Sequence, residues 1–98
     1  MFVLFCGSQL ESGQSWCPDC VKAEPVVAKV AKERSEGVLV HCAVGPRDSW
    51  KSPDNEFRTH PKLKLTAVPT LLQWGSNKRL VEEECTKEDL VRMLFEEE

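Results

Sequence analysis

The spacing of two cysteines is the feature that most constrains what this chain can fold into. Cys17 and Cys20 stand three positions apart, directly after Trp16 and at the start of a helical pattern. An apolar run, Phe2–Cys6, precedes them and predicts a short strand that is buried on both faces. Because residues three apart lie on the same side of a helix, the two sulfurs come within bonding range. A dithiol placed after a strand and at the start of a helix suits reversible disulfide chemistry.

Within this dithiol, Cys17 is the expected nucleophile. Backbone N–H groups and the helix dipole stabilise negative charge at a helix start, where thiols can have a pKa of roughly 3.5 to 7.5, against about 8.5 for a free cysteine. Cys20, one turn further on, is expected to be more buried and to resolve the mixed disulfide. Pro18 and Asp19 are expected to tune the redox potential, because proline removes an amide donor and Asp19 adds a negative charge beside the thiolate.

Length and composition predict one ordinary globular domain. The 98 residues are enough for a single core, so the domain is expected to span residues 1–98. A formal net charge of -3 excludes the broad basic surface of a nucleic-acid-binding protein. No segment approaches the ~20 apolar residues of a membrane span, and the opening apolar run is too short for a signal peptide. A cytosolic protein is therefore expected, in which a Cys-x-x-Cys pair is catalytic or metal-binding.

The rest of the chain alternates between helix and strand patterns. After the first strand, the predicted elements are a helix over residues 17–34 that contains Pro25 and stops at Gly37, a buried strand over 38–44, a short helix that begins at Ser52 and Pro53, strands over 69–74 and 78–82, and a last helix capped by Thr86 and Asp89 with Leu90, Met93 and Leu94 inward. This β-α-β-α-β-β-α order predicts an α/β fold with helices on both faces of a central four-stranded mixed sheet. The first two strands are expected to be parallel, and the last two to form an antiparallel hairpin.

This topology, with Cys-x-x-Cys at the start of the first helix, resembles the thioredoxin fold. A second mark is the sequence Val68-Pro69-Thr70 before the third strand. In thioredoxin-like proteins the matching proline is cis and faces the dithiol. The resemblance implies that Pro69 holds the substrate backbone against the dithiol, with Val68 and Thr70 beside it. The alternative is an ordinary proline at the start of a strand.

Longer segments narrow the resemblance to one family. Residues 16–20, 23–27, 50–58 and 65–72 are similar to the family of thioredoxin domain-containing protein 17, the 14-kDa thioredoxin-related proteins, and the similarity covers nearly the whole chain. Members of that family normally carry a further strand and helix before the strand at Phe2–Cys6. The resemblance therefore implies an N-terminally shortened member that lacks this strand and helix.

The same resemblance implies the activity and the partners. We expect a cytoplasmic protein-disulfide reductase that takes electrons from NADPH through thioredoxin reductase and binds no cofactor itself. Its substrates would be proteins or small molecules that contain a disulfide. Peroxide could be reduced by the same pair, through a sulfenic acid at Cys17 that Cys20 resolves. A monomer without nucleic-acid or membrane partners is expected.

Aromatic residues near these motifs allow two interpretations. Trp16 is expected to provide a flat apolar surface for substrate beside the dithiol, or else to be a core aromatic. Trp50 and Phe57 could form a wall that excludes some substrates, and core packing is an equally good interpretation.

Two other functions stay open at this point. The chain could be a thioredoxin-like adaptor in signalling, with little turnover. It could also be a metal-binding module in which the dithiol is half of a zinc site, but structural zinc usually needs a second close pair of ligands. The remaining candidate ligands offer no such pair: Cys6, His41, Cys42, His60 and Cys85. No metal ligands are therefore predicted, and the three further cysteines are expected to be small buried apolar residues.

Overall fold

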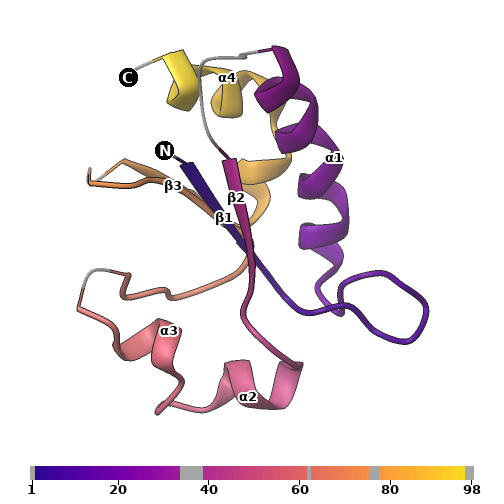
Figure 1. Ribbon diagram of the computed structural model, residues 1–98, viewed down its shortest axis with the longest axis vertical. Coiled ribbons are helices and arrows are strands. Elements are labelled where there is room, and N and C mark those ends of the chain that lie inside the picture. The colour runs from indigo at the N-terminus through magenta and orange to yellow at the C-terminus, as the bar shows by residue number, and fades with distance from the viewer. Residues whose placement is uncertain (1, 34–38, 62, 76–77, 97–98) are drawn as a thin grey trace.

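The computed structural model describes residues 2–33, 39–61, 63–75 and 78–96 (Figure 1). In chain order the elements are β1 (Phe2–Cys6), α1 (Pro18–Glu33), β2 (Leu39–Ala43), α2 (Arg47–Lys51), α3 (Glu56–Thr59), β3 (Thr70–Gln73), β4 (Arg79–Val81), the 3-10 helix η1 (Glu82–Thr86) and α4 (Glu88–Glu96). The predicted α/β architecture is confirmed. The predicted helix stop at Gly37 lies outside the described residues, as does part of the predicted hairpin loop.

Four strands of the described residues form one mixed sheet in the order β2-β1-β3-β4. β1 is parallel to β2, with Leu4 opposite His41. β1 is antiparallel to β3, and β3 is antiparallel to β4. Because β1 has a neighbour on each side, all of its residues are buried, as its continuous apolar sequence predicts. β2 lies at an edge, and its residues are partly or fully exposed, so the burial predicted for this strand is wrong for Leu39–Ala43.

The two faces of the sheet are covered by different helices. Side chains alternate along β1. Phe2 faces α4, where its ring centroid lies 4.2 Å from that of Phe95. Phe5 points to the other face, and its ring centroid lies 5.9 Å from that of Phe57 in α3. Figure 1 shows α1 and α4 together in one layer, with α2 and α3 at the lower end of the molecule.

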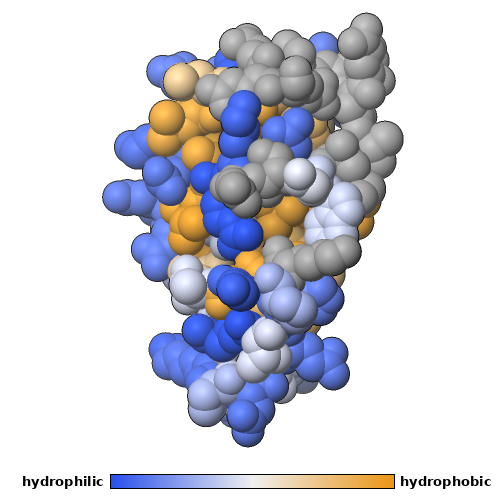
Figure 2. Space-filling model, turned by 90° about the vertical axis from the view of Figure 1, so that its left-hand side faces the viewer, coloured by the Kyte–Doolittle hydropathy of each residue, from blue (hydrophilic) through white to orange (hydrophobic). Residues whose placement is uncertain are grey.

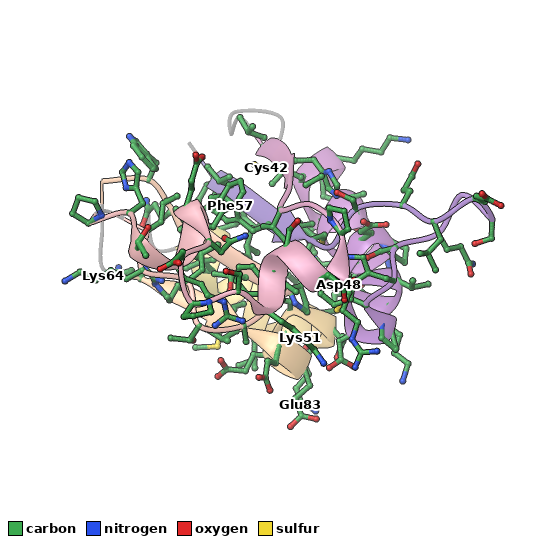
Figure 3. All side chains as sticks on the ribbon, turned by 90° about the horizontal axis from the view of Figure 1, so that it is seen from below. Cys42, Asp48, Lys51, Phe57, Lys64 and Glu83 are labelled. Carbon is green, nitrogen blue, oxygen red and sulfur yellow. The ribbon has the colours of Figure 1, made fainter. Side chains whose placement is uncertain are left out.

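Seen from the side of the β3–β4 hairpin, the surface divides into two regions. Figure 2 shows apolar atoms over the middle of this face, with hydrophilic side chains between them, and mostly hydrophilic side chains over the lower end. From below, Lys64 and Glu83 project outward from the periphery (Figure 3), and both side chains are exposed.

No helix in the described part of the chain is both long and apolar enough to cross a membrane.

The buried face of the last helix, α4, differs in part from the one that the sequence pattern predicts. Val91, Leu94 and Phe95 are buried, whereas Met93 is 53% exposed. The predicted inward position of Met93 is therefore wrong, because the apolar face of α4 is rotated toward Val91 and Phe95. Leu90 is only partly buried.

Two predicted helix starts are also wrong. Ser52 follows α2, a helix that the sequence pattern did not reveal, and acts as its C-cap. The N-cap of α3 is Asn55, whose side chain accepts a hydrogen bond of 2.9 Å from the backbone N–H of Phe57. Thr86 lies in η1, where its hydroxyl donates a hydrogen bond of 2.6 Å to the carbonyl of Glu83. Short polar side chains suit several local roles, so their identity alone does not locate a helix start.

Candidate active site

Cys17 directly precedes α1, and its sulfur takes the place of an N-cap acceptor. The backbone N–H of Cys20 donates a hydrogen bond of 3.2 Å to the sulfur of Cys17. The backbone N–H of Cys17 donates to the hydroxyl of Ser15 at 3.2 Å. A backbone donor aimed at a sulfur favours its thiolate form. Cys17 is 5% exposed and Cys20 is fully buried, which confirms that the second cysteine is the more buried one.

The loop before the dithiol is anchored by Trp16. Its indole N–H donates a hydrogen bond of 2.8 Å to the carbonyl of Gly45. The same carbonyl accepts the backbone N–H of Ser8 at 3.1 Å, and the carbonyl of Ser8 accepts the backbone N–H of Trp16 at 3.3 Å. Trp16 is half-buried and packs against the core. The indole therefore holds the loop in place, and its contact with substrate stays a prediction.

Val68 lies against the dithiol, although it is 51 positions away in sequence from Cys17. The thiol of Cys17 donates a hydrogen bond of 3.5 Å to the carbonyl of Val68. The Val68–Pro69 peptide bond is cis. Val68 is 8% exposed, and Pro69 is fully buried. The tertiary structure thus brings Val68 to Cys17, as the resemblance implied.

Thr70 follows in the same segment, but its side-chain hydroxyl already makes a hydrogen bond within the protein. It is 1% exposed, and its hydroxyl donates a hydrogen bond of 2.6 Å to the carbonyl of Ala67. The carbonyl of Pro69 accepts the backbone N–H of Glu82 at 2.7 Å. A substrate contact in this segment is therefore more easily made by the backbone at Val68 than by the side chain of Thr70.

The reduced dithiol is a coupled pair of thiols. The hydrogen bond with Cys20 and burial raise the pKa of Cys17 above its ordinary value, whereas the backbone N–H of Cys20 lowers it. The hydrogen bond with Cys17 lowers the pKa of Cys20, but a hydrogen bond with Cys6 and burial raise it, to about 12 in all. The helix position predicts a lowered pKa for Cys17, whereas its pKa is raised in this reduced site. Two sulfurs that share a proton lose their protons in two coupled steps.

The two residues between the cysteines lie in the first turn of α1. Pro18 is exposed, and Asp19 is half-buried. After the hydrogen bond with Cys20 and burial, the charge of Asp19 also raises the pKa of Cys17. This is the predicted direction, although Asp19 contributes less than the sulfur of Cys20.

The other three cysteines differ in burial. Cys6 and Cys85 are fully buried, as predicted, and Cys42 is only partly buried. The thiol of Cys85 donates a hydrogen bond of 3.4 Å to the carbonyl of Leu80, and burial raises its pKa to about 12. Burial also raises the pKa of Cys42, which lies on the edge strand β2 (Figure 3).

Trp50 and Phe57 pack into the core. Trp50 is 5% exposed, and the guanidinium of Arg58 lies 4.1 Å from the centroid of its ring. Arg58 also donates its Nε–H to the carbonyl of Trp50 at 2.6 Å. Phe57 packs against Phe5 of the sheet. These contacts fit the core interpretation, and a wall that excludes substrates stays a prediction.

One cluster of metal-ligating groups was not foreseen from the sequence. The ligand atoms of Cys6, Glu24 and His41 all lie within 4.8 Å of one another. Among the described residues, no cluster of three such ligands includes Cys17 or Cys20. The only sequence signal was that Glu24 follows Cys20 by four residues and so shares its helix face.

Comparison with known proteins gives a consistent set of matches. A family model described as "Thioredoxin domain-containing protein 17-like, thioredoxin domain" matches residues 1–97. Thioredoxin domain-containing protein 17 from Homo sapiens is 52% identical over 99 residues, which cover 100% of this chain and 79% of that protein. The Danio rerio protein of that name is 54% identical with the same coverage. The thioredoxin-like protein Clot from Arabidopsis thaliana is 45% identical over 78 residues, 78% of this chain and 58% of that protein.

Proposed function

The chain belongs to the thioredoxin domain-containing protein 17-like family, and on that premise we propose that it is a protein-disulfide reductase with Cys17 and Cys20 as its redox pair. One observation carries the proposal. The sulfur of Cys17 lies between the backbone N–H of Cys20, at 3.2 Å, and the carbonyl of Val68, at 3.5 Å. The first group stabilises a thiolate, and the second is a backbone acceptor beside the point of attack.

The reaction proceeds by two sulfur exchanges. The Cys17 thiolate attacks one sulfur of the substrate disulfide, so a new S–S bond forms and the other substrate sulfur leaves as a thiolate that takes up a proton. Cys20 then loses its proton and attacks the sulfur of Cys17. This step closes the Cys17–Cys20 disulfide and releases the second substrate sulfur. Two electrons from NADPH, passed on by thioredoxin reductase, and two protons, one of them from solvent, restore the dithiol.

The site also accounts for how the nucleophile is activated. In the reduced state the thiol of Cys17 donates to the carbonyl of Val68, and the sulfurs of Cys17 and Cys20 share a hydrogen bond. When the proton of Cys17 leaves, its thiolate accepts both the backbone N–H and the thiol of Cys20. Substrate backbone can then take the acceptor at Val68, which holds the disulfide beside the thiolate. Activation is therefore linked to substrate binding.

The same two thiols can reduce peroxide. A peroxide oxygen is transferred to Cys17, which becomes a sulfenic acid, and the remaining oxygen leaves as water or an alcohol. Cys20 then attacks the oxidised sulfur, releases water and forms the same disulfide. In the proposed cycle the protein acts as a cytoplasmic monomer with thioredoxin reductase as its partner.

A coupled reduction assay tests the proposal. Insulin or cystine is the substrate, and NADPH oxidation in the presence of thioredoxin reductase is the readout. We expect turnover by the native chain, none by Cys17→Ser, and unchanged turnover by Cys42→Ser, which alters a cysteine outside the pair. Lack of turnover by a folded native chain would contradict the proposal and favour an adaptor that binds partners through the same surface.

A further inference from the structure

Three side chains from three different elements meet beside the redox pair. Cys6 ends β1, Glu24 lies in α1, and His41 lies in the middle of β2. Their sulfur, carboxylate oxygen and ring nitrogen lie within 4.8 Å of one another. The register that sets His41 opposite Leu4 places both on the sheet face that Cys6 shares. Glu24 reaches this face from the helix that covers it.

The distances suit a tetrahedral zinc ion. Zinc bonds to nitrogen and oxygen of about 2.0 to 2.2 Å place two such ligands roughly 3.4 Å apart, and a sulfur and a nitrogen ligand roughly 3.6 Å apart. The Nε2 atom of His41 and the Oε1 atom of Glu24 are 3.1 Å apart and share a hydrogen bond, which bonds to the metal would replace. The pairs that involve Cys6, at no more than 4.8 Å, need shifts of about 1 Å to reach zinc geometry.

His41 and Glu24, whose side chains reach solvent, can make the shifts that metal binding requires. The side chains of His41 and Glu24 are 50% and 34% exposed, whereas Cys6 is fully buried. The sulfur is therefore the fixed ligand at the bottom of the site, and the imidazole and carboxylate close over it from the solvent side.

We propose that Cys6, Glu24 and His41 form a binding site for a divalent transition metal of the zinc class, with water as the fourth ligand. One sulfur, one nitrogen and one oxygen suit a borderline-soft ion, whereas magnesium and calcium prefer oxygen alone. Three protein ligands with one open position are typical of zinc sites that keep a water. The metal bonds to the thiolate, so binding releases the thiol proton of Cys6 to solvent. The thiol of Cys6 shares a hydrogen bond with Cys20, so the site borders the proposed redox pair, but metal binding here does not require the proposed reductase activity.

Cobalt titration of a chain without the redox dithiol tests this site. Cys17→Ser/Cys20→Ser removes the other pair of thiols that could bind metal. Co²⁺ reports tetrahedral coordination by its visible absorbance, and a thiolate ligand by a near-ultraviolet charge-transfer band. We expect one Co²⁺ per chain, both spectral features, and displacement by Zn²⁺.

Single changes in that background identify the ligands. We expect His41→Ala and Glu24→Gln each to weaken Co²⁺ binding at least tenfold, and Cys6→Ser to abolish the charge-transfer band. His60→Ala changes an exposed histidine outside the cluster and should bind as tightly as its parent. Should Cys6→Ser fail to fold by circular dichroism, the His41 and Glu24 variants decide, because both side chains reach solvent.

Three results would overturn the site. The first is a folded double variant that takes up no Co²⁺ while the native chain does, which would locate the metal at Cys17 and Cys20. The second is binding that His41→Ala leaves unchanged. The third is binding without a thiolate band, which would exclude Cys6 as a ligand.

Discussion

Gly7 lies against the indole of Trp16, and the ring occupies the space that a side chain at Gly7 would need. The Nε1 atom of the indole is 2.7 Å from the position that a Cβ at Gly7 would take. The same nitrogen donates to the carbonyl of Gly45, so the ring cannot shift without losing this hydrogen bond. Because Cys17 follows Trp16 directly, this contact helps to determine where the dithiol lies.

Gly7→Ala should destabilise the protein and disturb the loop before the dithiol. The added methyl group overlaps the ring, and overpacking of this kind costs about 1 to 3 kcal/mol. Urea unfolding measures the loss, and tryptophan fluorescence reports the moved indole. In a Trp16→Ala background the same change should cost little, because the ring is gone. An equal cost in both backgrounds would show that the contact is not the cause.

Cys20→Ser should make Cys17 more reactive near neutral pH. The largest cause that raises the pKa of Cys17 is its hydrogen bond with Cys20, and the serine variant keeps the backbone N–H that lowers it. When the pKa of a thiol falls toward neutral pH, the thiolate fraction rises about tenfold for each pH unit of the decrease. The rate of alkylation by iodoacetamide, followed at the Cys17 peptide by mass spectrometry, should therefore rise. An unchanged or slower rate would contradict the cause we assign.

Asp19→Asn should act in the same direction with a smaller effect. The charge of Asp19 raises the pKa of Cys17, but it contributes less than Cys20 or burial. We expect the pH profile of Cys17 alkylation to move to lower pH, by less than in Cys20→Ser. Asp48→Asn changes an exposed acid in α2 and serves as the control. A profile that moves to higher pH in Asp19→Asn would refute the assignment.

Phe95→Ala should cause a large loss of stability. Phe95 is 2% exposed, and its ring packs on Phe2 with centroids 4.2 Å apart. Deleting a buried phenylalanine side chain costs about 3 to 5 kcal/mol through lost burial and the cavity it leaves. Met93→Ala, two positions away on the exposed face, should stay within about 0.5 kcal/mol of the native chain. Urea unfolding of both variants decides whether α4 packs as described.

The ion pairs between α1 and α4 should matter only at low salt and above acidic pH. A hydrogen bond from Lys29 at 2.9 Å, followed by the charges of Lys29 and Arg92, lowers the pKa of Glu88 below its ordinary value of 4.5. An acid whose pKa is lower in the folded state than in the unfolded state stabilises the fold at pH values above its unfolded-state pKa. This contribution is lost as the pH falls through the lower, folded-state pKa. Glu88→Gln should therefore lower Tm slightly at neutral pH. The difference should disappear in strong acid or high salt.

Much of the fold could be predicted from local pattern. The strand at Phe2–Cys6 is found with the predicted bounds, because a short, wholly apolar run between polar segments suits an inner strand. α1 lies within one residue of its predicted bounds at each end. Several of the wrong predictions depended on a single polar residue, as at Ser52 and Thr86. Such side chains cap, end or interrupt helices with similar energies, and the surrounding packing selects among these roles.

For the candidate site, the pairing of Cys17 with Cys20 could be predicted from the sequence alone, because helical geometry brings two cysteines three positions apart onto one side of α1. The groups that surround this pair depend on how the elements pack in three dimensions. The chain path brings the carbonyl of Val68 to Cys17. The hydrogen bond with Cys20 and burial raise the pKa of Cys17, which the helix start alone would lower. Likewise, the β1–β2 register and the rotation of α1 bring His41 and Glu24 to Cys6. Contacts between elements depend on how these elements dock, and local sequence does not carry that information.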